Sequence, residues 1–144
     1  MNDRSDPGTV RAARRLKADT VTLAHGGGGK AMRDLVEDVL TSVFEPADME
    51  DQARLADAAM REEGARLAFT TDSFVVDPVE FPGGDIGKIA VCGTVNDLAV
   101  GGAKPLWLSA AFIIEEGVEV ALLRRIAPLG LEDGEAWEQR RRRH

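Results

Sequence analysis

Asn96 and Asp97 stand inside an otherwise small and apolar stretch, residues 86–100. The residues around them predict a helix that is buried on most sides. An unpaired buried carboxylate is strongly unfavourable, so Asp97 needs a partner: a metal ion, a basic side chain or a cluster of backbone amides. A hydrogen-bonded core aspartate with no further role is the alternative.

A glycine-rich stretch is the second place where chemistry is expected. It consists of His25, Gly26, Gly27, Gly28, Gly29 and Lys30. Backbone without Cβ atoms can fold closely around phosphate oxygens, which suits a polyphosphate ligand. The stretch is not a Walker A loop, because Ala31 stands where a Ser or Thr would hold magnesium. A flexible hinge, with Lys30 as a solvated charge, is the alternative.

Asp72 closes a predicted strand and could join Asp97 at one site. Magnesium bound to nucleotide phosphates needs few protein carboxylates, so the two aspartates and the glycine-rich stretch predict a shared magnesium–phosphate site. Cys92 has no adjacent histidine to activate it and is interpreted as a small core residue.

Alternating strands and helices must position these groups. Apolar periodicity predicts an amphipathic helix over residues 31–44, with Arg33, Asp34, Glu37 and Asp38 on its outer side, and further helices over 85–100 and 118–126. Strands are predicted at 21–24, 67–71 and 74–76. Residues 106–114 are apolar on both alternating faces, which predicts a central strand covered on two sides.

Composition narrows the classes of function. At 144 residues one domain is expected, and the net charge of -7 argues against nucleic-acid binding despite the arginine run near the C-terminus. One cysteine excludes an internal disulfide framework and suits a reducing cytoplasm, and no apolar run is long enough to cross a membrane. Residues 1–19 are predicted to form a flexible arm.

Four segments together resemble the amino-terminal half of the hydrogenase maturation factor family HypE. They are residues 24–32, 71–76, 81–88 and 93–105, and the third reads Phe81, Pro82, Gly83, Gly84, Asp85, Ile86, Gly87, Lys88. The resemblance implies a PurM-like α/β (α+β) domain over residues 20–127, with a mixed sheet covered by helices and closed into a barrel across a homodimer. Residues 128–144 fall outside it and are expected to form a disordered tail.

The resemblance also implies an activity. Members of this family are ATP-dependent dehydratases that convert an S-carboxamide on a carboxy-terminal cysteine to a thiocyanate, for the cyanide ligands of nickel–iron hydrogenase. HypF supplies the carbamoyl group, and the HypC–HypD complex receives the product. By this likeness Asp72 and Asp97 hold Mg2+, with Asn96 alongside, while residues 25–30 cover the phosphates of ATP.

Some residues depart from the family pattern. An acidic pair is reduced here to Ala56 and Asp57, and the expected second domain and terminal cysteine are not found in the sequence. The chain is therefore expected to be a truncated HypE that binds nucleotide and dimerises, with no catalytic residue of its own. The alternatives are a non-catalytic module that binds HypF or full-length HypE, and a small ATP-binding enzyme with an unknown substrate.

Overall fold

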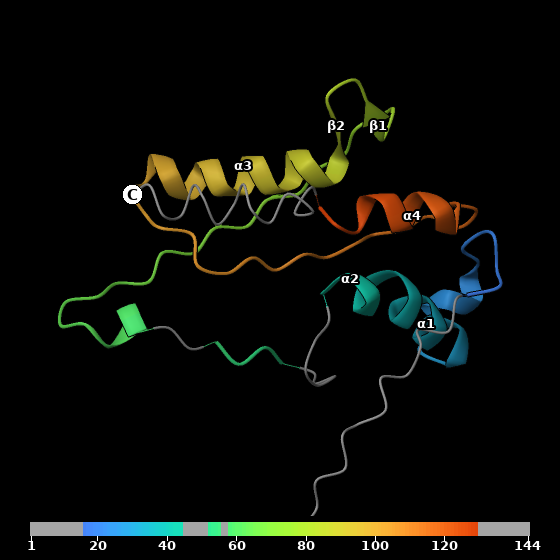
Figure 1. Ribbon diagram of the computed structural model, residues 1–144, viewed down its shortest axis with the longest axis horizontal. Coiled ribbons are helices and arrows are strands. Elements are labelled where there is room, and N and C mark those ends of the chain that lie inside the picture. The colour runs from blue at the N-terminus through green and yellow to red at the C-terminus, as the bar shows by residue number, and fades with distance from the viewer. Residues whose placement is uncertain (1–15, 45–51, 56–57, 130–144) are drawn as a thin grey trace, which may run out of the picture.

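The computed structural model describes residues 16–44, 52–55 and 58–129 (Figure 1). Its helical elements are η1 (Leu23–Gly26), α1 (Lys30–Leu35), η2 (Val36–Thr41), α2 (Ser42–Phe44), η3 (Ala58–Arg61), α3 (Ile86–Val100) and α4 (Val120–Ile126). Two short strands, β1 (Glu80–Phe81) and β2 (Gly84–Asp85), pair antiparallel. No helix in these described ranges has the length and apolar character needed to cross a bilayer.

The predicted amphipathic helix is confirmed as the continuous run of α1, η2 and α2. Its middle turn, η2, is a π-helix, and the wider turn changes which residues face inward. Leu35 and Val39 are buried as expected, but Met32 is exposed, and Asp38 is buried although the sequence predicted it on the outer side. The core cluster contains Val21, Leu35, Val39, Val120, Leu123 and Ala127.

Residues 19–21, just before η1, form backbone hydrogen bonds with residues 117–120 at the start of α4. The Val21 amide donates to the Val118 carbonyl at 2.8 Å, and the Gly117 amide donates to the Val21 carbonyl at 2.8 Å. The Val120 amide donates to the Asp19 carbonyl at 2.9 Å. The predicted strand at 21–24 is therefore extended only at its start, because Leu23 already begins the 3-10 helix η1.

A buried ion pair between Asp38 of η2 and Arg124 of α4 joins these two helices. Asp38 accepts hydrogen bonds from the Leu16 amide at 3.1 Å and from Arg124 Nη2 at 2.5 Å. Arg124 Nη2 also donates to the Leu16 carbonyl at 3.5 Å. The predicted flexible arm thus does not extend through residue 19, since Leu16 is held by both partners; residues 1–15 lie outside the described part of the chain.

The β1–β2 hairpin leads into α3, and this helix begins where the sequence predicts. Asp85 is its N-cap and accepts from the Lys88 amide at 2.8 Å, and Gly101 and Gly102 end it. The first turn of α3 packs closely on the end of α4, where a Cβ on Gly87 would lie 3.0 Å from the Ile126 carbonyl oxygen. Glu80 and Arg125 form an ion pair at 2.8 Å that joins the hairpin to α4.

Two long extended segments run beneath α3, residues 65–76 and 103–115 (Figure 1). Neither is paired in a sheet with another described segment. The predicted central strand at 106–114 is therefore wrong for this structure, and the predicted mixed sheet is reduced to the β1–β2 pair within the described residues. The backbone of residues 106–114 is extended as expected, but no strand lies beside it among the described residues.

Candidate functional site

The glycine-rich stretch joins η1 to α1 and is open on its outer side. Gly28 has a φ of 71°, which favours glycine, and Cβ atoms on Gly26, Gly28 or Gly29 would meet no atom within 4 Å. Lys30 forms an ion pair with Asp34 one turn along α1. The backbone of this loop is therefore accessible to a ligand, while its one lysine already has an anionic partner.

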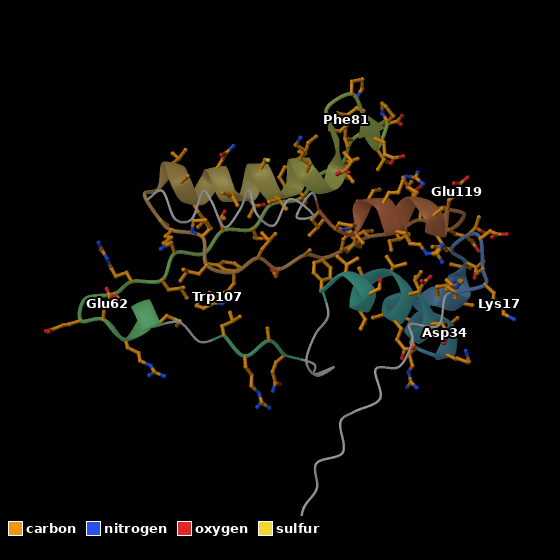
Figure 2. The ribbon with its side chains drawn as sticks, in the orientation of Figure 1. Lys17, Asp34, Glu62, Phe81, Trp107 and Glu119 are labelled. Carbon is orange, nitrogen blue, oxygen red and sulfur yellow. The ribbon has the colours of Figure 1, made fainter. Side chains whose placement is uncertain are left out.

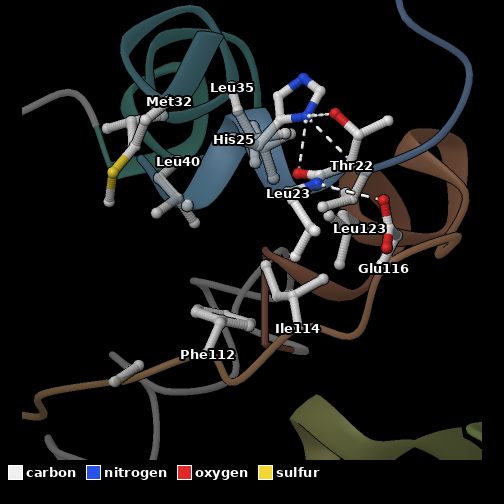
Figure 3. A pocket seen from close by; sticks show the side chains of 15 residues that line it. Thr22, Leu23, His25, Met32, Leu35, Leu40, Phe112, Ile114, Glu116 and Leu123 are labelled. Atoms are coloured by element: carbon white, nitrogen blue, oxygen red, sulfur yellow. Dashed lines mark hydrogen bonds between the residues drawn. The ribbon is translucent and has the colours of Figure 1, made fainter. Parts of the chain in front are cut away.

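His25 lies at the start of this loop and is buried. Its Nδ1 lies 3.0 Å from both the backbone nitrogen and the Oγ1 of Thr22. His25 also lines an apolar cavity of about 350 Å³ together with Gly26. Figure 3 shows the labelled apolar side chains from the helical run and from Phe112 and Ile114 around this space.

Asp72 is exposed at the edge of a second cavity of about 330 Å³. This cavity lies between α3 and the two extended segments, and its polar lining includes Thr70, Thr94 and Ser109. Asp72 Oδ1 accepts from the Ser73 amide at 2.7 Å. The carboxylate therefore has backbone support and still faces solvent.

Asp97 and Asn96 are exposed on α3, so the prediction that they are buried is wrong. Asp97 Oδ2 accepts a long hydrogen bond of 3.5 Å from Thr70 Oγ1. Cys92 is also exposed, contrary to its predicted place in the core. Cys92, Asn96 and Asp97 are exposed for the same reason. The composition of α3 predicted burial on most sides, but the extended segments beneath the helix cover only part of its surface.

The structure brings some of the predicted site residues together and separates others. Thr70 lines the same cavity as Asp72 and donates a long hydrogen bond to Asp97, which does not itself line that cavity. From the glycine-rich stretch, His25 and Gly26 line a different cavity, and the two cavities share no residue. Figure 2 shows Trp107, which lines the second cavity, on the extended segment beneath α3, and Asp34 on α1.

The predicted site shared by the two aspartates and the glycine-rich stretch is not assembled within the described residues, because His25 and Gly26 line one cavity and Asp72 lines another. Among the described residues, no three His, Cys, Asp or Glu side chains converge into a closed metal site. Magnesium bound with a nucleotide takes one or two protein carboxylates and fills its other positions with water and phosphate oxygens. Asp72 and Asp97 are both exposed carboxylates, and each accepts one hydrogen bond, from the Ser73 amide and from Thr70 Oγ1 respectively. Ala56 and Asp57 lie outside the described residues.

Sequence reasoning missed two supporting residues, Thr22 and Thr70. Thr22 and His25 have the spacing of a capping box, with histidine in place of the usual glutamate, and this signal was present in the sequence. No local pattern links Thr70 to Asp97, because their contact depends on how residues 65–76 lie against α3.

Residues 50–134, more than half of the chain, match the family model "AIR synthase related protein, N-terminal domain". The chain belongs to this family. It is 77% identical over 121 residues to "Carbamoyl dehydratase HypE" of Rhodobacter capsulatus, which covers 84% of this chain and 36% of that protein. It is 50% identical over 111 residues to the protein of the same name from Escherichia coli, covering 75% of this chain and 33% of that protein.

A third relative is "Hydrogenase expression/formation protein HupE" of Azotobacter chroococcum, 45% identical over 112 residues, or 77% of this chain and 32% of the relative. The chain thus spans about a third of the length of the curated relatives that it matches. None of the solved structures matches it.

Proposed function

We propose that this chain provides the nucleotide-binding and dimerisation part of a HypE-like carbamoyl dehydratase in nickel–iron hydrogenase maturation. The observation that carries the proposal is the 77% identity to the Rhodobacter capsulatus protein across 84% of this chain. The motifs around His25, Asp72 and Asp97 all lie on the resembling segments.

The reaction proposed for the complete enzyme converts a thiol-bound carboxamide to a thiocyanate. ATP supplies the activation, since the carboxamide oxygen leaves as phosphate and ADP is formed. Asp72 and Asp97 would hold Mg2+, with Asn96 alongside. The open backbone of residues 26–29 lies at a separate cavity in the free chain, so it would receive phosphate oxygens only after the loop moves toward the aspartates. The one cysteine of this sequence, Cys92, lies in α3, so the step on the thiol belongs to another part of the enzyme.

A second copy of the chain is the proposed cover for residues 65–76 and 103–115. These segments have unpaired backbone and exposed apolar side chains, including Val75 and Ile113 at 99% and 101% exposure. Pairing with the same segments of another copy would satisfy the backbone and bury the side chains, giving an α/β sheet that closes as a barrel across the dimer. Partner proteins HypF and HypC–HypD and a cytoplasmic location are part of the same proposal.

Titration with Mg-ATP during thermal unfolding tests the nucleotide part. The expected result is a higher melting temperature with Mg-ATP, and a loss of this shift in Asp72→Asn and Asp97→Asn. Glu62→Gln, at an exposed position outside both cavities, is the matched control and should keep the shift. A chain that stays monomeric in sedimentation and whose melting does not respond to Mg-ATP would overturn the proposal.

The exposed apolar segments favour one other function, a non-catalytic module that binds HypF or full-length HypE. Coexpression with each protein followed by affinity capture separates the two. Capture that needs no nucleotide and survives Asp72→Asn supports the module, whereas self-association with nucleotide binding supports the first proposal.

A further inference from the structure

The first cavity, beside η1 and α1, has an apolar part that takes no part in the proposed nucleotide binding. It is bounded by the helical run on one side and by Phe112 and Ile114 of the extended segment on the other (Figure 3). Two lining residues are largely accessible, since Leu23 is 78% and Met32 is 41% exposed. An apolar group from outside can therefore enter the cavity.

The size and lining of this cavity suit one large aromatic side chain. Its volume of about 350 Å³ lies at the lower end of the range for sites that enclose a small organic molecule, roughly 300–1,000 Å³. Figure 3 shows Thr22, His25 and Glu116 grouped on one side, so the polar groups of the lining are not spread over its apolar walls. Tryptophan has an apolar body and a single N–H donor, which matches a lining of this kind.

The surface beside the cavity carries negative charge. Glu116 lines the cavity and accepts the Leu23 amide at 3.3 Å, and the exposed Glu115 precedes it. Among the described residues neither carboxylate forms an ion pair, and no lysine or arginine there lines the cavity. An occupant with positive charge close to its aromatic side chain is therefore favoured.

The sequence itself contains a segment with this combination. Residues 130–144, which follow the described part of the chain, contain Trp137 and an arginine run at 140–143. No other segment outside the described residues has an aromatic side chain. Residues 130–144 therefore supply both features that the cavity and its surroundings favour.

The length of chain after α4 allows this contact. Leu123 lines the cavity and lies six residues before Leu129, the last described residue, so at most roughly 22 Å of extended chain separates them. Eight residues lead from Leu129 to Trp137 and span up to roughly 29 Å when extended. Trp137 therefore has enough chain to return to the cavity.

We propose that residues 130–144 dock on this cavity of their own chain. The indole of Trp137 inserts between the helical run and Phe112, and the arginine run lies beside Glu115 and Glu116. The covalent link makes the contact intramolecular, so it avoids most of the entropy cost of bringing a separate partner to the surface. The docking is independent of nucleotide binding.

The second cavity is a poorer match for the same side chain. Its polar lining comprises four hydroxyl groups and a carboxylate, from Thr70, Thr71, Thr94, Ser109 and Asp72. An indole there would displace water from most of these groups, and burying a polar group without a hydrogen bond is unfavourable. Insertion into the first cavity of a second copy is the remaining alternative, and it differs in its dependence on protein concentration.

Fluorine-19 NMR of the full chain labelled with 5-fluorotryptophan tests the insertion, with Trp107→Phe and Trp137→Phe assigning the two resonances. The Trp137 resonance should lie away from its position in urea and move toward it in Ala110→Leu, which puts a larger side chain at the cavity. Ala111→Leu, at the adjacent exposed position that lines neither cavity, is the matched control and should leave the resonance unchanged. A Trp137 resonance at the urea position in the unsubstituted chain would overturn the proposal, as would equal effects of the two leucine substitutions.

Charge and concentration provide two further measurements. Glu116→Gln keeps the acceptor for the Leu23 amide and removes the charge, so the ratio of docked to free Trp137 should fall about twofold to fivefold, as expected for exposed ion pairs. Glu62→Gln, at an exposed position away from the cavity, should leave this ratio unchanged. An unchanged ratio in Glu116→Gln would overturn the role of the arginine run. A Trp137 resonance that depends on protein concentration would show insertion into a second copy and overturn docking within one chain.

Discussion

The apolar side chains are buried in one part of the molecule, around α1, η2 and α4, and exposed in another, along residues 65–76 and 103–115. Around α1, η2 and α4, Leu35, Val39 and Leu123 are buried, and the backbone segments between them are hydrogen bonded. Along residues 65–76 and 103–115, side chains of similar character face solvent, and the backbone has no sheet partner in the described chain. Stability within one chain is therefore expected from the first half, and association from the second.

The largest effect should come from the ion pair inside the packed half. Asp38→Asn leaves Arg124 without its anionic partner in a mostly buried position, and breaking such a pair costs about 3–5 kcal/mol in the free energy of unfolding. Asp34→Asn, in α1 and paired with the exposed Lys30, is the surface control and should cost less than about 1 kcal/mol. Urea unfolding measures both, and equal losses would contradict the assigned burial.

A matched pair of leucines compares the halves directly. Leu123→Ala removes a core side chain and should cost about 2–5 kcal/mol at any protein concentration. Leu67→Ala, at an exposed position, should change the unfolding of the monomer by no more than about 0.5 kcal/mol. Sedimentation should show weaker self-association for Leu67→Ala. Under conditions in which Leu123→Ala remains folded, its self-association should be unchanged. The reverse pattern would show that the extended half is not an association surface.

The contact between Phe74 and α3 offers a smaller test. A Cβ on Gly93 would lie 2.7 Å from the tip of the Phe74 ring, so Gly93→Ala must push the ring away from the helix. We expect a loss of about 1–2 kcal/mol, near the low end for overpacking, because the half-buried ring can move. Gly101→Ala, with ordinary contacts at 3.5 and 3.8 Å, is the control. Restoration of stability by Phe74→Leu in the Gly93→Ala chain would confirm the cause.

The smallest effect is expected at the exposed pair of Glu80 and Arg125. Hydrogen bonding to Arg125 lowers the pKa of Glu80 below its ordinary value of 4.5. A lowered folded-state pKa contributes stability at pH values above 4.5, and this contribution is lost as the pH falls through the folded-state value. Thermal melts of the unsubstituted chain and Glu80→Gln between about pH 3 and 7 should therefore differ slightly at neutral pH and converge in acid. A difference that grows in acid would contradict the shift.

Local signals in the sequence predicted the packed half well. The helix over 31–44 in that half depends on near neighbours and was confirmed, as were the Asp85 cap and the glycines that end α3 outside it. The burial of Asp38 was not predicted, because a π-helical turn breaks the 3.6-residue periodicity on which the assignment of faces depends. The alternating apolar residues of 106–114 indicated an extended segment correctly, but not whether another strand lies beside it.

For the candidate site, too, the sequence predicted the residue types but not their long-range arrangement. Its residue types were visible in the sequence, and Thr70 lines the cavity at Asp72 and donates to Asp97. The separate cavities of His25 and Asp72 could not be predicted, because the path between them depends on long-range packing rather than on any motif.

The close approach of Gly87 to the end of α4 gives α3 one firm anchor, at its first turn. Toward the opposite end of the helix, Asp97 accepts a long hydrogen bond from Thr70 in the extended segment beneath it. Amide hydrogen exchange should therefore be slowest near Gly87 and quicken toward Val100, and occupancy of the aspartate site by a ligand would be registered first as slower exchange at that far end.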